Sequence, residues 1–158
     1  MDVFDEEVLA LWKAFDKNQL EYIMVGGFAT NLHGYMRTTA DMDIWIKDTI
    51  ENRKKLNQSL IDFGYGEIHN IERLEFIPGW TSLKLSSGLE LDIMTFLKGF
   101  PQERFDECMQ LSSSAIIFNT EIKFLHFNHL IEAKKATHRN KDLIDIEELE
   151  KIKNNNSI

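Results

Sequence analysis

Two strand-like segments lie on either side of a pair of adjacent glycines, and they restrict this chain to folds that contain a sheet. Tyr22–Val25 is a short apolar run followed at once by Gly26-Gly27, which is typical of a buried strand that ends in a tight turn. Asp41–Lys47 alternates acidic and apolar residues, and this period of two predicts a second strand. Between them, Phe28–His33 is predicted to form a short helix.

The remaining segments continue this mixture of strands and helices. Helices are predicted at Val3–Lys17, Glu51–Phe63, Pro101–Met109 and, broken near His138–Asn140, Phe127–Lys151. Two hairpins are predicted, Trp80–Leu85 with Leu89–Phe96 and Ala115–Phe118 with Glu121–Phe124. Strands interleaved with helices indicate an α/β or α+β fold. No linker-like stretch divides the 158 residues, so we predict one domain over 1–158, with a core at about 20–125 and C-terminal helices at about 126–152.

Composition and charge exclude several classes of protein. The net charge of −8 argues against a general DNA coat or a polybasic membrane binder. Because Cys108 is the single cysteine, an intramolecular disulfide framework and a zinc site of several thiolates are excluded. No apolar run approaches the roughly 18 residues that a membrane span needs. The first residues are acidic, unlike a secretory leader, so we expect a cytoplasmic protein with no membrane partner.

Three acidic residues are candidates for a metal site. Asp41 and Asp43 are two residues apart on a predicted strand, so their side chains point to the same face. Asp92 alternates with apolar residues on another predicted strand, and the three carboxylates converge if the two strands are neighbours. Carboxylates so close repel each other unless a cation lies between them, and Mg²⁺ prefers such oxygens. The alternative is that Asp41 and Asp43 are solvated residues on an open face.

Two further features suit an anionic ligand. Gly26-Gly27 precedes a helix, where close backbone approach and unpaired N–H groups favour phosphate, although an ordinary strand-to-helix turn would look the same. The segment Lys123–Lys141 carries five cations and one acid, a net charge of +4 in an acidic chain, which indicates a local anion site. The alternative is a solvated helix face with salt bridges. Asp142 and Asp145 are interpreted as structural residues that orient Arg139 or Lys141.

Taken together, these motifs resemble the nucleotidyltransferase (polymerase β-like) superfamily, whose signature is a strand, a Gly-Gly or Gly-Ser turn and an hDhD strand. The segment Arg37-Thr38-Thr39-Ala40 fits the Arg-x-Thr-x-Asp lead-in of its small bacterial branch. The segment Lys134–Asp145 looks like the Lys-x-x-Ala-x-x-Arg-x-Lys-Asp-x-x-Asp segment of AbiEii-type toxin nucleotidyltransferases. His138 and Asn140 stand where that segment is expected to have Gly and Pro, which bears on the turn between the helices.

The resemblance implies a nucleotidyltransferase fold, with a mixed central sheet flanked by helices and a C-terminal helical segment. It implies an enzyme that uses Mg²⁺ to transfer a nucleoside monophosphate from an NTP to an acceptor hydroxyl. Asp41, Asp43 and Asp92 would be catalytic and hold one or two Mg²⁺ ions, with Asp92 also a candidate base. The implied nucleotide-binding residues are Gly26, Gly27, Arg37, Thr39, Lys134, Arg139 and Lys141.

Several questions stay open at this level. The implied acceptor is RNA, such as a tRNA end, or a protein hydroxyl, and the AbiEii-like segment adds a toxin–antitoxin role with a cognate antitoxin as partner. One alternative is a non-catalytic nucleotide-binding or antitoxin-like partner of the same fold. Another is an antibiotic-type enzyme that modifies a small molecule. Arg37 either binds a phosphate or pairs with one of the strand carboxylates.

Overall fold

The structure is a computed structural model that describes residues 6–156, and it is built on a six-stranded mixed sheet in the order β3-β4-β2-β1-β6-β5. At the centre, β1 is antiparallel to β2 and parallel to β6, and β2 is parallel to β4. β3 and β5 close the edges as antiparallel hairpin partners of β4 and β6. The strands are β1 Tyr22–Val25, β2 Asp41–Ile46, β3 Ser82–Lys84, β4 Glu90–Met94, β5 Ser113–Ile117 and β6 Thr120–Phe124. The predicted mixed α/β class is confirmed.

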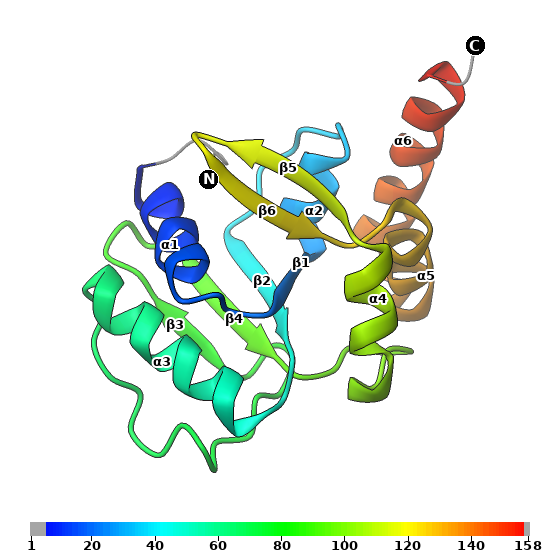
Figure 1. Cartoon of the computed structure of the whole chain (residues 1–158). Coiled ribbons are helices and arrows are strands. Elements are labelled where there is room, and N and C mark those ends of the chain that lie inside the picture. Colours follow the sequence, from blue (N-terminus) through cyan, green and yellow to red (C-terminus); the bar gives the residue numbers. More distant parts are fainter. Residues whose placement is uncertain (1–5, 157–158) are drawn as a thin grey trace.

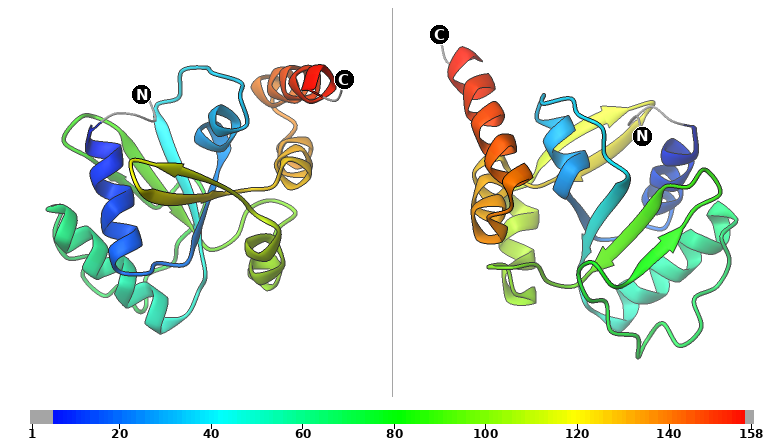
Figure 2. Two further views of the ribbon diagram at one scale, coloured as in Figure 1. Left: turned by 45° about the horizontal axis from the view of Figure 1, so that its top comes forward. Right: turned by 180° about the vertical axis from the view of Figure 1, so that it is seen from behind.

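Helices cover both faces of this sheet. Figures 1 and 2 show α1 (Glu6–Lys17) and α3 (Ile50–Phe63) together on one side. The other side carries α2 (Gly26–Leu32), α4 (Phe105–Leu111) after the short 3₁₀ turn η1 (Gln102–Arg104), α5 (Phe127–Thr137) and α6 (Asn140–Asn156). In residues 6–156, no helix combines the length and the apolar character needed to cross a membrane.

Amphipathic patterns in the sequence explain which faces are buried. α1 buries Val8, Leu11, Trp12 and Phe15, which share one helical face and join a core that the sheet completes. All four residues of β1 are buried, as its continuous apolar run predicts. The predicted start of the first helix at Val3 lies outside the described residues.

The elements differ from the sequence predictions mainly at their ends. α2 begins at Gly26, two residues before the predicted start, so the glycine pair is part of the helix. α6 continues past the predicted end at residue 152 to Asn156. The predicted break between the last two helices is confirmed at His138, whose φ of 50° lies in the left-handed region. That backbone conformation explains why glycine suits this turn.

Candidate active site

Neighbouring strands bring the three predicted acidic residues to one face of the sheet. In the parallel pairing of β2 with β4, Asp43 lies opposite Asp92, and Asp41 lies opposite Glu90. Asp41 is exposed, Asp43 is half-buried and Asp92 is buried. The adjacency on which the sequence argument depended is therefore present, and the carboxylates form a graded series from solvent into the protein.

The glycine turn lies directly over Asp43. β1 is paired with β2 so that Val25 lies opposite Asp43, and Gly26 follows with a φ of 65°. A Cβ at Gly26 would collide with the Asp43 carboxylate, and one at Gly27 would lie 2.6 Å from the Thr39 hydroxyl oxygen. Both positions therefore require glycine for close approach, and Gly26 also requires it for its backbone conformation.

Burial and mutual repulsion shift the protonation of these acids. Burial, followed by the nearby charges of Asp92 and Asp41, raises the pKa of Asp43 to about 7, against the opposing effect of Lys141 and Arg139. Burial is also the main reason that the pKa of Asp92 is raised. Like charges held this close in a poorly solvated place are a destabilising arrangement that a bound cation relieves.

Asp92 has one satisfied and one unsatisfied oxygen. The backbone N–H of Gly79 donates to Asp92 Oδ2 at 2.9 Å, which fixes the carboxylate. Asp92 Oδ1 is buried and has no hydrogen-bond partner within residues 6–156. A buried oxygen without a partner is costly, so this atom is suited to receive a ligand, a proton or a metal ion.

This donor set fits Mg²⁺, although the side chains are not drawn into a closed cage. Among the described residues, no three His, Cys, Asp or Glu side chains form a cluster that could hold a metal by themselves. Mg²⁺ is commonly held by one or two carboxylates and completes its shell with water and substrate phosphates. Asp43 beside Asp92 supplies that partial set, and Asp92 Oδ1 is the atom most in need of a partner.

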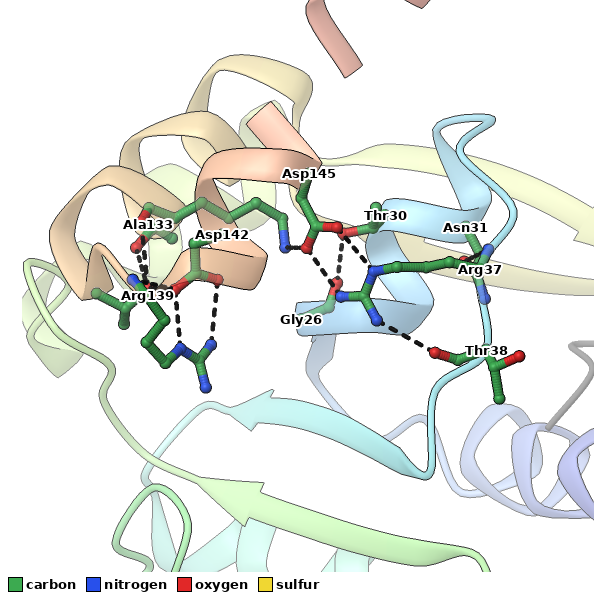
Figure 3. A network of polar contacts seen from close by, with 11 residues as sticks. Gly26, Thr30, Asn31, Arg37, Thr38, Ala133, Arg139, Asp142 and Asp145 are labelled. Atoms are coloured by element: carbon green, nitrogen blue, oxygen red, sulfur yellow. Dashed lines mark hydrogen bonds and ion pairs between the residues drawn. The ribbon is translucent and has the colours of Figure 1, made fainter. Parts of the chain in front are cut away.

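A buried carboxylate joins two of the predicted phosphate-binding cations (Figure 3). Asp145 on α6 accepts hydrogen bonds from Arg37 Nε and Nη2, both at 2.8 Å, and from Lys134 Nζ at 2.8 Å. Asp145 and Lys134 are almost fully buried. Burial acts to raise the pKa of Asp145, but the bonds from Arg37 and Lys134 lower it overall. The single carboxylate of Asp145 thus pairs with two cations, so the group of three side chains has a net positive charge.

Asp142 organises the next turn in the same way. It accepts from Arg139 Nε at 2.8 Å and from the Thr137 hydroxyl at 2.7 Å. Burial opposes its ionisation, but these bonds lower the pKa of Asp142 to about 2. The prediction that Asp142 orients Arg139 is confirmed. Asp145 is a structural residue as predicted, but the predicted partners are wrong, because it holds Arg37 and Lys134 and not Arg139 or Lys141.

All the predicted site residues line one pocket with a cavity volume of about 500 Å³. Arg37 pairs there with Asp145, so the alternative in which it pairs with a strand carboxylate is wrong. The ammonium group of Lys141 has no hydrogen-bond or ion-pair partner in the part of the chain that the structure describes. Sequence reasoning missed the rest of the lining, which comes from loops, from the end of β4 and from one face of α5: Pro78, Gly79, Met94, Leu97, Lys98, Leu130, Ala133 and Thr137.

Comparison with known proteins places the fold of this chain among the nucleotidyltransferase folds. No protein-family model and no curated protein sequence matches the chain. Among solved structures, it is similar to the lincosamide antibiotic adenylyltransferase LnuA with lincomycin bound, at a TM-score of 0.62 and 18% identity over 96% of this chain and 99% of that one. It is also similar to an antigenic nucleotidyltransferase-like protein from Paracoccidioides brasiliensis, at a TM-score of 0.53 and 18% identity over 90% of this chain and 72% of that one.

These likenesses establish the nucleotidyltransferase fold that the motifs predicted. At 18% identity they concern the fold, so the chemistry has to be argued from the residues of this chain. The narrower resemblance to the AbiEii type finds no counterpart among these structures and stays a prediction from the sequence.

Proposed function

We propose that this protein is a Mg²⁺-dependent nucleotidyltransferase that moves a nucleoside monophosphate from an NTP to an acceptor hydroxyl. The observation that carries the proposal is the pairing of Asp43 with Asp92 on adjacent strands, directly under the Gly26 turn. This arrangement lies in a pocket that also holds four cationic side chains from the predicted set: Arg37, Lys134, Arg139 and Lys141.

The pocket holds acidic side chains for a metal ion and cationic side chains for the phosphates in separate groups. Asp41, Asp43 and Asp92 are the residues that would hold Mg²⁺, which when bound neutralises phosphate charge and polarises the reacting oxygens. The Gly26-Gly27 backbone admits the triphosphate at close range. The surplus positive charge of the Arg37–Asp145–Lys134 group faces the same pocket and binds the phosphates electrostatically.

The transfer itself requires one bond to form and one to break. The acceptor oxygen forms a bond to the α-phosphorus, the bond from that phosphorus to the bridging oxygen breaks, and pyrophosphate leaves with the bonding electrons. The acceptor proton passes to the Asp92 carboxylate, whose pKa is raised by burial. Most of the acceleration then comes from positioning and from charge neutralisation.

For the acceptor, we propose a small hydroxyl-bearing molecule. Three cationic residues of the pocket are ion-paired with carboxylates of the same chain: Arg37, Lys134 and Arg139. An acidic protein with a net charge of −8 is poorly suited to many RNA phosphate contacts. The likeness to LnuA, an antibiotic adenylyltransferase solved with lincomycin, runs along nearly the whole of both chains and supports the same choice.

RNA modification within a toxin–antitoxin pair is the second candidate. The AbiEii-like order of residues from Lys134 to Asp145 favours it, because the two acids of that segment are the ones that hold Arg139, Arg37 and Lys134 in place. In this case the acceptor is an RNA end and a cognate antitoxin is the partner.

Calorimetry tests nucleotide binding, the step common to both candidates. We expect each Mg²⁺-NTP to bind the wild-type protein, and Asp41→Asn/Asp43→Asn to weaken Mg²⁺-dependent binding more than tenfold while the protein stays folded. Glu67→Gln is the matched control, since Glu67 is an exposed acid without a partner among the described residues. Absence of binding by the wild-type protein would refute the proposal, and binding without Mg²⁺ dependence would refute the role of the carboxylates.

A further inference from the structure

A tight turn after β4 forms part of the pocket wall. The backbone N–H of Phe100 donates to the carbonyl of Leu97 at 2.8 Å, and that of Leu97 donates back to Phe100 at 3.0 Å. Gly99 has a φ of 82°, as the third residue of a type II turn requires. Phe100 is fully buried, and Arg104 donates to the Gly99 carbonyl at 3.2 Å. The turn is therefore held firmly in place.

Lys98 occupies the second position of this turn and lines the pocket. It is exposed, and no hydrogen bond or ion pair joins its ammonium group to another residue in the described range 6–156. Lys134 and Arg139, in contrast, are each paired with a carboxylate in the same pocket. Lys98 is thus a hydrogen-bond donor at the pocket whose ammonium group is not paired with any residue in the range 6–156.

The pocket beside Lys98 is apolar. Met94 follows Asp92 by two residues, and Leu130 and Ala133 lie three residues apart on α5, which places them on one helical face. The turn rests against this helix, since a Cβ at Gly99 would lie 3.6 Å from that of Ala136. We call this part of the pocket the apolar end; it is formed by Met94, Leu97, Leu130 and Ala133.

The chemistry of this end suits a heteroaromatic ring. Ligand pockets are commonly lined by apolar side chains with a few polar groups that fix orientation. A nucleobase has two apolar faces and acceptor atoms on its edge, and a lysine ammonium group is a donor only. The triphosphate is assigned to the other part of the pocket, at Gly26-Gly27 and the cations paired with Asp142 and Asp145.

We propose that the apolar end binds the nucleobase of the NTP and that Lys98 donates a hydrogen bond to an acceptor atom on the edge of the base. This inference rests on the proposed function and adds to it the place and the polar contact of the base. Lys98 is then a residue that sets the affinity for the nucleoside and contributes to the choice among the four bases.

Inorganic triphosphate separates contacts with the base from contacts with the phosphates. Dissociation constants are measured by calorimetry with Mg²⁺ for ATP, GTP, CTP, UTP and inorganic triphosphate. We expect Lys98→Ala to weaken the tightest-binding NTP about tenfold, the size of one charge-assisted hydrogen bond, and to leave triphosphate within twofold. Lys98→Arg should keep most of the affinity. Lys13→Ala is the matched control, because Lys13 is an exposed lysine of α1, on the opposite side of the sheet.

A second variant tests the apolar end by volume. Ala133→Leu adds three carbon atoms to a pocket-lining position and should weaken all four NTPs while sparing inorganic triphosphate. Equal losses for NTP and triphosphate in Lys98→Ala would assign Lys98 to the phosphates and overturn the proposal, as would unchanged NTP affinities in both variants. If the wild-type protein bound triphosphate and NTPs equally well, the nucleobase site would be refuted but the phosphate site would stand. If it bound neither, the proposed function itself would be refuted.

Discussion

The charge of Asp43 should destabilise the protein when no cation is present. Burial and the neighbouring acids raise the pKa of Asp43 from 3.8 to about 7, so the folded state binds a proton more tightly than the unfolded chain does. The free energy of unfolding therefore falls as the pH rises from about 4 to about 7, by at most about 4 kcal/mol for such a pair of pKa values. Solvent screening at a half-buried carboxyl reduces this, and we expect a penalty of about 1–2 kcal/mol at pH 8.

Asp43→Asn removes that penalty while keeping the size of the side chain. At pH 8 without divalent cations, the variant should melt about 3–6 °C above the wild-type protein, and the difference should vanish near pH 4. Addition of Mg²⁺ should raise the melting temperature of the wild-type protein at pH 8 and have little effect on the variant. Thermal melting across pH 4–8, with Glu67→Gln as control, measures both effects. A variant that melts below the wild-type protein at pH 8 would refute the reasoning.

Three further predictions concern the frame of the site. Gly26→Ala should abolish transfer and cost about 1–2 kcal/mol, because its φ is 65° and its Cβ meets the Asp43 carboxylate; activity and melting temperature report the two effects. Asp145→Asn leaves two cations with one neutral partner and should lower the free energy of unfolding in urea by about 3 kcal/mol. Because hydrogen bonds from Arg139 and Thr137 lower the pKa of Asp142 to about 2, its ionised carboxylate should add about 1–2 kcal/mol to the free energy of unfolding above pH 4, and this is lost toward pH 2. Urea titration across this pH range checks it, because the free energy of unfolding of Asp142→Asn should be less sensitive to acid.

Local patterns were sufficient to predict two of the three acidic residues that lie together in the pocket. Alternation along one strand places Asp41 and Asp43 on the same face, and the glycine pair marks the turn that lies over them. The sequence predicts a strand around Asp92, but it predicts that Asp92 lies near Asp43 only if this strand is next to β2, and that depends on long-range pairing. The parallel partnership of β2 and β4 supplies that missing condition.

The cationic half depends on contacts that no local pattern encodes. The pair between Arg37 and Asp145 spans 108 residues of sequence, and nothing near Arg37 distinguishes this partner from a strand carboxylate or a phosphate. Lys98 was not predicted as a pocket residue for the same reason. Its role in the pocket wall arises from a turn that rests on α5, more than 30 residues further along the chain. The positive φ of His138, in contrast, agrees with the glycine that the AbiEii-like pattern has at that position.

The most direct test of the central claim follows the two ends of the nucleotide separately. The protein is incubated with Mg²⁺ and each NTP, labelled with ³²P at the α or the γ position, together with a lincosamide and aminoglycoside panel, with total RNA or with total protein. We expect the α label to appear on a small-molecule acceptor and the γ label to be released in pyrophosphate. Both the labelled acceptor and the labelled pyrophosphate should be absent with Asp41→Ala/Asp43→Ala. Transfer of the γ label to an acceptor, or undiminished α transfer by the double variant, would contradict the account.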